Sequence, residues 1–312
     1  MIRIGISGYN ETAERVVALL ENTHRVMLSG FHTDSAVENA ALAGTGYTGF
    51  NTFKELIQHS DLVLLLQDDV NALPLAEKVI KHGRHVYVHQ LRHFQDDYIG
   101  YLMRLSLEAG VRTFINFDLL YHPVVNELTR WLGDPQIIDV SLGRMEGSRE
   151  DVHGDRYLVS AALLVKALSR RSDLPRLHAQ TLHRAGAAGN PVQLRLEYPS
   201  GCLANVMLHG DAVPGHNRIK IYQSNGYMEA DLDFGLITTQ RYTDGPAPAN
   251  QNTDALINVE AVPDEAAGLK HFLKRLTQNG AVDYIEFGAL YDATKAVAPV
   301  RQKLNQYGVS TQ

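Results

Sequence analysis

The first loop of the chain has the residue types and spacing of a phosphate-binding turn. Residues 2–6 alternate isoleucine with arginine and glycine, which predicts a β-strand, and helical spacing of apolar residues begins at Ala13. Between them, Gly8, Asn10 and Ala13 occupy the three glycine positions of a GxGxxG fingerprint. Backbone amides and the dipole at a helix N-terminus attract a pyrophosphate. The candidate cofactor-binding residues of this loop are Gly8, Tyr9, Asn10 and Glu11.

Asn10 is a departure from the fingerprint, because its side chain stands where the backbone should approach a phosphate. Asparagine tolerates a positive φ better than most residues, which reduces the penalty. The loop therefore has two interpretations, a working pyrophosphate site or a tight turn that caps a structural helix.

The end of the second predicted strand, Val26–Phe31, holds the next candidate site. An acidic residue here usually binds the ribose hydroxyls of a dinucleotide. His32 occupies the ribose position, whereas Asp34 lies two residues later and either contacts ribose or precedes a helix cap at Ser35. His32 and Thr33 could also donate to a 2′-phosphate, so the predicted cofactor is NAD or NADP.

A third candidate segment follows the apolar run 61–66, which is typical of a strand buried on both faces. Gln67, Asp68 and Asp69 come directly after it and would lie near a bound phosphate or ribose. Two carboxylates at this point would repel a phosphate.

Strands alternate with helices over the first 120 residues. Capping-box patterns at 35–38 and 52–55 predict two helix starts, and Gly83 and Gly110 stand where left-handed helix ends belong. Such alternation predicts a doubly wound parallel sheet of the Rossmann, dinucleotide-binding type over residues 1–120.

After residue 120 the pattern changes to consecutive strand-like runs separated by turn clusters, with helices near both ends. The fold class predicted for residues 121–312 is therefore α+β, with a large open mixed or antiparallel sheet. The runs are Ile137–Arg144, Val192–Tyr198, Cys202–His209, Arg218–Gln223 and Tyr227–Asp231.

Composition excludes several classes of protein. The chain of 312 residues has a formal net charge of −6, which argues against a general nucleic-acid binder. Its one cysteine, Cys202, excludes an intrachain disulfide and a site with several thiolate ligands. Histidines 82, 85, 89 and 93 span a predicted helix end, strand and loop, so we expect no metal. Without a membrane-length apolar run or a signal region, we expect a cytoplasmic protein without membrane contact.

Four segments in order resemble the glucose–fructose oxidoreductase and inositol dehydrogenase family (Gfo/Idh/MocA). Residues 72–90 resemble the family's helix that runs into "AGKHVLCEKP", and 117–123 resemble its entry to the second domain. Residues 192–207 and 219–231 resemble its "FANGALATL" hairpin and "IEIYGTEGTLELD" segment. The resemblance implies an NAD(P)-dependent oxidoreductase that acts on a polyol, sugar or related hydroxyl compound.

The resemblance fails at the residues that would move the proton. The family's Glu-Lys-Pro lysine corresponds to Gln90, which can donate a hydrogen bond but cannot exchange a proton near neutral pH. The family's Asp and His helix corresponds to residues 155–168, which contain no histidine. Besides Gln90, the candidate catalytic residues are His89, Tyr121, His122 and Tyr157.

Two functions stay open. One is an oxidoreductase with rearranged acid and base groups, and the other is a catalytically degenerate relative that binds nucleotide or a small ligand as a regulatory or scaffold subunit. In either case the sheet of the second domain needs a cover over its open face, so we expect a homodimer or tetramer formed through it.

Overall fold

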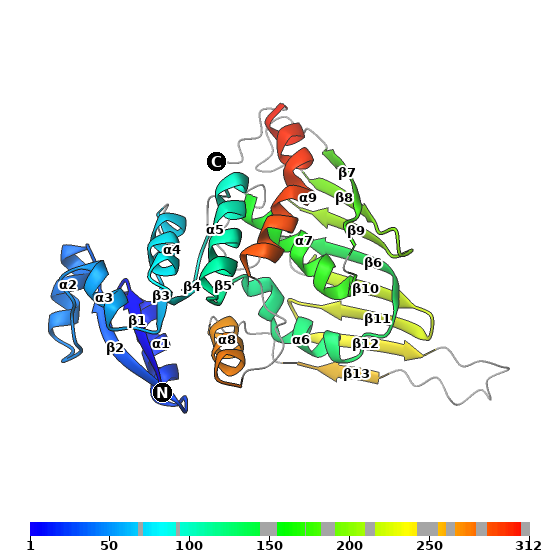
Figure 1. Cartoon of the computed structure of the whole chain (residues 1–312). Helices are drawn as coiled ribbons and strands as arrows, with labels where there is room; N and C mark the ends of the chain where they lie inside the picture. The colour runs from blue at the N-terminus through cyan, green and yellow to red at the C-terminus, as the bar shows by residue number, and fades with distance from the viewer. Residues whose placement is uncertain are drawn as a thin grey trace. The chain divides into compact units, whose positions relative to one another are not determined.

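The computed structural model (Figure 1) describes residues 1–67, 71–91, 94–143, 155–171, 173–181, 191–209, 216–241, 255–259, 266–278 and 286–306. The chain forms two compact units. The first comprises Met1–Asp118 and Glu265–Tyr291, and the second comprises Leu119–Asp264 and Asp292–Gln312. Each unit is built on one sheet.

The first unit contains a five-stranded parallel sheet of order β2-β1-β3-β4-β5, which confirms the predicted Rossmann-type arrangement. Its strands are β1 (Ile2–Ser7), β2 (Val26–His32), β3 (Leu62–Leu65), β4 (His85–Val88) and β5 (Thr113–Ile115). Its helices include α1 (Glu11–Glu21), α2 (Ala36–Ala43), α3 (Phe53–Gln58), α4 (Ala72–Lys81) and α5 (Asp96–Ala109). All four residues of β3 are buried, as expected for a central strand covered on both faces.

Local signals place the helix ends where the sequence predicts them. Gly83 and Gly110 have φ values of 66° and 64°, the left-handed conformation that glycine adopts without steric cost. Thr52 and Glu55 close a full capping box at the start of α3. These ends depend on neighbouring residues alone, so the sequence was sufficient to predict them.

The first unit also contains α8 (Ala267–Gln278), although we predicted residues 121–312 to form one domain. The fully buried Phe272 of α8 lies against two aromatic side chains of the parallel sheet. Its ring centroid is 5.1 Å from that of Phe114 and 6.3 Å from that of Tyr87. Burial of this apolar surface, rather than chain order, attaches α8 to the first sheet.

The second unit contains an eight-stranded mixed sheet of order β13-β12-β11-β10-β6-β9-β8-β7, which confirms the α+β prediction. Its strands are β6 (Pro135–Leu142), β7 (Arg176–Thr181), β8 (Val192–Glu197), β9 (Leu203–Leu208), β10 (Arg218–Gln223), β11 (Gly226–Asp231), β12 (Leu236–Arg241) and β13 (Ala255–Asn258). All the pairs are antiparallel except β6 with β9.

Three helices belong to this second unit wholly or in part: α6 (Pro123–Arg130), α7 (Asp155–Ser169) and α9 (Phe287–Gln306). A 3-10 turn (η1, Asp118–Tyr121) precedes α6. The middle of α7 is buried, and Lys166 of α7 forms an ion pair of 3.0 Å with Asp292 of α9. From Ile137 onward in β6 and throughout β10, exposed or half-buried side chains alternate with buried ones, so one face of the sheet belongs to the core.

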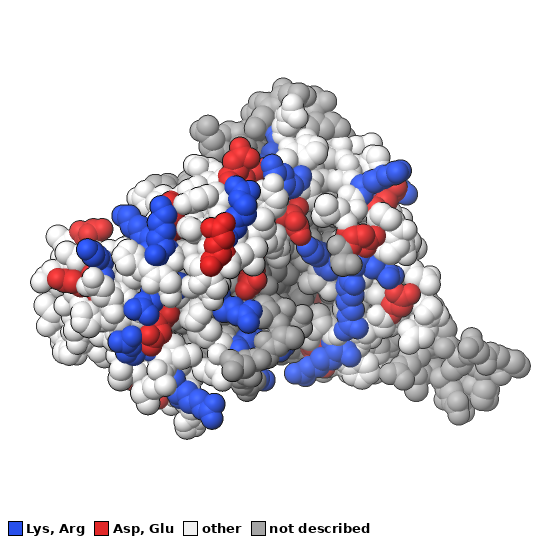
Figure 2. Space-filling model, viewed as in Figure 1, with Lys and Arg blue, Asp and Glu red and all other residues white. Residues whose placement is uncertain are grey.

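Acidic and basic side chains are interspersed on the face of the protein in Figure 2. Among the described residues, no helix combines the length and apolar character that a membrane-spanning segment requires. Cys202 is buried and unpaired. The described residues also contain no group of three or more His, Cys, Asp or Glu side chains arranged to hold a metal ion.

Candidate functional site

Gly8 has a backbone conformation and a close contact that favour glycine over any other residue. Its φ is +95°, a value that side-chain-bearing residues rarely adopt. A Cβ atom built on Gly8 would lie 3.1 Å from the backbone nitrogen of Gln67 and 3.3 Å from its Cβ. The amide of Gly8 donates to the carbonyl of His32 at 2.9 Å. The loop after β1 is therefore held against both neighbouring strand ends.

Asn10 caps α1. Its Oδ1 accepts from the amide of Ala13 at 3.1 Å, and its Nδ2 donates to the carbonyl of Leu66 at 3.4 Å. Its φ is −140°, so this position does not use the left-handed conformation that asparagine tolerates. The first turn of α1 carries Glu11 and Glu14. Their carboxylates stabilise the helix by interacting with its dipole, but they repel a bound anion.

The amide of Tyr9 is occupied by a side chain of α2. Tyr9 N donates to Glu38 Oε2 at 2.7 Å, and the hydroxyl of Thr33 donates to the same oxygen at 2.6 Å. The ring of Tyr9 is buried edge-on against Phe31, with centroids 5.2 Å apart. Burial, followed by the neighbouring Glu14, raises the pKa of the Tyr9 hydroxyl. The side chain of Tyr9 therefore packs into the first unit, while its backbone amide is held by Glu38 of α2.

The three candidates at the end of β2 have different surroundings. His32 is buried, and its Nδ1 lies 3.1 Å from the carbonyl of Phe50; because a carbonyl only accepts, Nδ1 carries the proton. Its Nε2 lies 3.4 Å from Asp34 Oδ1, and the side chain of Asp34 is 95% exposed. Thr33 is buried and donates to Glu38. Neither His32 nor Thr33 directs a free donor toward a 2′-phosphate in this arrangement.

Gln67 is half-buried, lies two residues beyond β3 and packs against Gly8. Asp68 and Asp69, the carboxylates predicted to lie beside it, fall outside the described residues.

His89 and Gln90 follow β4 at the same edge of the parallel sheet. His89 is buried, its amide donates to the carbonyl of Leu65 at 3.0 Å, and its Nδ1 lies 3.4 Å from the hydroxyl of Tyr87. Gln90 is half-buried. An imidazole is a side chain that can act as a general acid or base near neutral pH.

Tyr121, His122 and Tyr157 belong to the second unit and each has a structural partner. His122 is the N-cap of α6, and its Nδ1 accepts from the amide of Val124 at 3.3 Å. Tyr157 donates its hydroxyl proton to the carbonyl of Gly143 at 2.5 Å. Tyr121 is buried, and its carbonyl accepts from Asn126. Tyr157 would have to give up this bond in order to exchange a proton, and protonation of His122 at Nδ1 would break its cap on α6.

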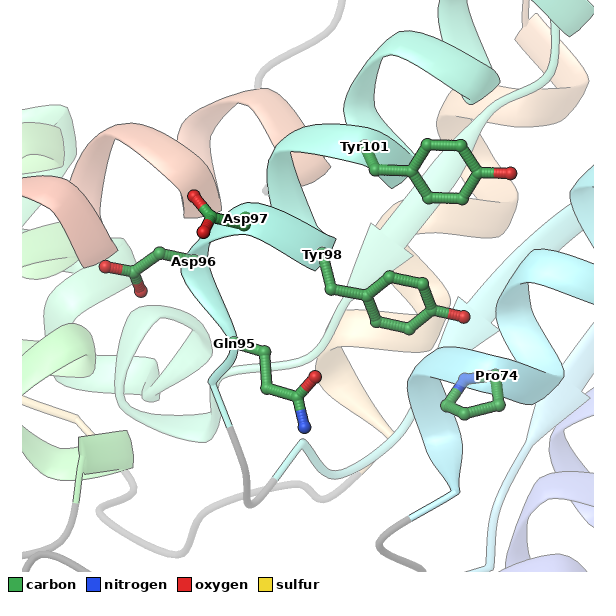
Figure 3. A pocket seen from close by; sticks show the side chains of 6 residues that line it. All are labelled: Pro74, Gln95, Asp96, Asp97, Tyr98 and Tyr101. Atoms are coloured by element: carbon green, nitrogen blue, oxygen red, sulfur yellow. The ribbon is translucent and has the colours of Figure 1, made fainter.

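A pocket of about 860 Å³ lies in the first unit beside α4 and α5, but no predicted site residue lines it (Figure 3). The rings of Tyr98 and Tyr101 extend to one side of α5, and the carboxylates of Asp96 and Asp97 point away from them. Next to the pocket, the carboxylate of Glu77 accepts from both tyrosine hydroxyls and from Lys81, and these bonds lower its pKa. Because these groups satisfy one another, we interpret the cluster as a link between α4 and α5.

The first unit brings together the candidates at the carboxyl ends of β1, β2 and β3. In this group, Tyr9 and Thr33 both donate to Glu38. Gly8 lies against the backbone of Gln67. Sequence reasoning missed Glu38 and assigned it to a capping box at the start of α2. The signal for Glu38 was a carboxylate close to the loop that follows a parallel strand. The sequence does not show that Glu38 is close to this loop, because the pairing of β1 with β2 brings the two segments together.

The chain matches no family model and no curated protein. It is similar in structure to UDP-N-acetylglucosamine 3-dehydrogenase GnnA from Acidithiobacillus ferrooxidans, with a TM-score of 0.78, 16% identity and 96% of each chain covered. A putative myo-inositol dehydrogenase from Sinorhizobium meliloti 1021 gives a TM-score of 0.73 at 13% identity, with 98% of each chain covered.

Biliverdin reductase from Synechocystis sp. PCC 6803, solved with biliverdin and NADP+, gives 0.69 at 16% identity, covering 96% of this chain and 98% of the other. These neighbours include oxidoreductases of the Gfo/Idh/MocA type. The chain has their fold. The likeness extends over both units, as the sequence resemblance implied.

Proposed function

We propose that this protein is an NAD(P)-dependent oxidoreductase of the Gfo/Idh/MocA type that acts on a polyol, sugar or related hydroxyl compound. The observation that carries the proposal is the likeness, over at least 96% of the chain, to dehydrogenases and reductases of known structure. The close approach of Gly8 to Gln67 at the carboxyl edge of the parallel sheet supports it, since open α/β sheets bind ligands at this edge.

The residues around Gly8 fit a dinucleotide in shape. A Cβ on Gly8 would make a tight contact of 3.1 Å with the backbone of Gln67, and the N-terminus of α1 follows within three residues. Glu11 and Glu14 weaken the attraction of this helix end for a phosphate. The loop residues 8–11 would lie along the phosphates, with the amides of Gly8 and Tyr9 donating to His32 and Glu38. His32, Thr33 and Asp34 would lie toward the adenosine end. When bound, the nicotinamide accepts a hydride from the carbon that carries the hydroxyl.

The hydroxyl must also lose its proton, and the acceptor needs a pKa near the working pH. We propose His89 for this role, because it follows β4 at the carboxyl edge of the parallel sheet, where open α/β sheets bind ligands, and because Gln90 cannot exchange a proton. Gln90 donates to the substrate oxygen in this scheme. Tyr121 is buried beside α6 and is a weaker candidate.

A panel of polyols, sugars and sugar acids tests the proposal, with turnover followed by NADH and NADPH absorbance. We expect His89→Asn to lower the rate by about 10²–10⁴, the usual contribution of a general base. The exposed His82 offers a matched control, and His82→Asn should leave the rate unchanged. Gln90→Lys should raise the rate if the rest of the site is intact. Absence of turnover on the whole panel with both cofactors would contradict the proposal.

We also propose a homodimer or tetramer that forms through the open face of the second sheet. That face is more polar than expected, with ion pairs such as Arg218–Asp231 at 3.2 Å. Apolar side chains cluster where Tyr222 pairs with Ile137 on one strand and Tyr227 on the other. Tyr222 and Ile137 are 37% and 39% exposed. Light scattering should give a dimer or larger, and Tyr222→Glu should reduce it; a monomeric wild type at micromolar concentration would contradict this proposal.

A further inference from the structure

Two helices of the first unit begin with the same motif, Ser/Thr-x-x-Glu, but only one forms a complete capping box. At α3, Thr52 accepts from the amide of Glu55 at 3.2 Å, and Glu55 accepts from the amide of Thr52 at 3.2 Å. At α2, Ser35 accepts from the amide of Glu38 at 3.3 Å, but the Glu38 side chain does not return to Ser35.

Thr33 replaces Glu38 in the cap of α2. Its hydroxyl oxygen accepts from the amide of Ser35 at 3.1 Å, and the same hydroxyl donates its proton to Glu38. The carboxylate of Glu38 is therefore released from the helix start and directed toward the loop after β1. A capping glutamate that is replaced in this way has become available for another contact.

The released carboxylate lies at the edge of the sheet where the two strands end together. Tyr9, whose amide it binds, lies two residues beyond β1, and Thr33 lies directly beyond β2. The two strands pair in parallel, with Ser7 opposite His32. Within the described part of the chain, both side-chain contacts use Oε2, and no residue donates to Oε1.

We infer that Glu38 is the acceptor for the 2′ and 3′ hydroxyls of the adenosine ribose and that it selects NAD over NADP. The inference rests on the proposed dinucleotide function and names the residue that sets its cofactor preference. A ribose diol donates hydrogen bonds and a carboxylate accepts them, and such charge-assisted bonds are strong. A 2′-phosphate would instead place a charge of about −2 next to the Glu38 carboxylate, which would repel it.

The structure favours Glu38 over Asp34, the position that the sequence motif suggested. The Asp34 side chain is 95% exposed, and its one ion-pair contact is with the buried His32. Glu38 is half-buried and fixed by two short hydrogen bonds to groups on different strand ends. A group held from two sides is positioned before the ligand arrives, which reduces the entropy lost on binding.

The test uses calorimetric titration with ADP-ribose and with 2′-phospho-ADP-ribose, which contain the adenosine end without the nicotinamide. We expect the wild type to bind ADP-ribose at least about tenfold tighter than its 2′-phosphate. Glu38→Gln, which keeps an acceptor for Tyr9, should weaken ADP-ribose binding by about tenfold or more and remove most of the preference. Glu21→Gln, on the exposed last residue of α1, should bind like the wild type.

The ratio of the two affinities is the readout, because a change in folding stability affects both ligands equally. An unchanged ratio in Glu38→Gln, or tighter binding of ADP-ribose, would overturn the inference; the latter would mean that the carboxylate blocks the loop. Thr33→Val leaves the carboxylate but removes one of its supports, so the ratio should fall by less than in Glu38→Gln.

The outcomes also separate this inference from the proposed function. If ADP-ribose binds with the expected ratio but no substrate of the panel is turned over, the proposed reaction fails and the role of Glu38 stands. A wild type that turns over substrate with NADPH in preference to NADH would overturn the role of Glu38 and leave the reaction standing. A wild type that binds neither ligand would overturn both.

Discussion

Replacing Gly8 with alanine would add a Cβ atom where the loop after β1 meets Gln67. Two separate costs arise. The φ of +95° lies in the region that residues with a Cβ avoid, and leaving it unchanged costs about 1–2 kcal/mol. The new atom would also lie 3.1 Å from the Gln67 backbone nitrogen, which cannot rotate away as a side chain could. Overpacking of this kind costs about 1–3 kcal/mol.

Gly201 provides the matched control. It lies in the turn between β8 and β9 with the same φ of +95°, but nothing lies within 4 Å of a Cβ built there. Gly201→Ala therefore has only the backbone cost, about 1–2 kcal/mol, whereas Gly8→Ala should lose about 2–5 kcal/mol of unfolding free energy. The difference between the two variants isolates the contact with Gln67.

Differential scanning calorimetry measures both variants against the wild type, since it detects the unfolding of each unit without a local probe. Gly8→Ala should lower the midpoint temperature of the transition that includes the first unit. Gly201→Ala should lower the midpoint temperature of the second unit's transition by a smaller amount. Equal losses in the two variants, or a smaller loss for Gly8→Ala, would refute the close-approach argument. The loop would then tolerate a side chain, and its fit to a dinucleotide would lose support.

Three further changes test other contacts. Hydrogen bonds from Arg3 lower the pKa of Asp61 from 3.8 to about 2, an effect of at most about 2.4 kcal/mol that solvent screening reduces to about 1 kcal/mol. Because the folded-state pKa is depressed, this stability is present above about pH 4 and is lost as pH falls toward 2; Asp61→Asn should remove that part of the acid dependence in urea titrations. His122→Ala should cost about 1–2 kcal/mol through loss of the α6 cap, and an unchanged urea midpoint would rule out that cap. Tyr157→Phe should cost about 1–2 kcal/mol because the Gly143 carbonyl loses its donor, and a neutral effect on thermal unfolding would argue that water replaces the hydroxyl.

The sequence was sufficient for the features that depend on neighbouring residues. The period-2 and period-3.6 patterns predicted the strands of the first sheet and five of the eight strands of the second, and Gly83 and Gly110 marked helix ends that have positive φ. The order of alternating elements then predicted a parallel sheet, since short crossovers permit few arrangements. The position of Gly8 in the first loop belongs to the same class, because glycine at a strand-to-helix turn has a local cause.

Only the tertiary structure decided which side chains meet at that edge. Ser35 and Glu38 have the spacing of a capping box, as Thr52 and Glu55 do, yet the nearness of Tyr9 and Thr33 diverts Glu38 to another strand end. His32 occupied the ribose position in the sequence, but a carbonyl 18 residues later holds its Nδ1. The spacing of residues in the sequence predicts only the partners that a side chain can contact within its own helix or strand. The competing partner comes from a segment brought close by strand pairing, and the free energy of that contact does not depend on its distance along the chain.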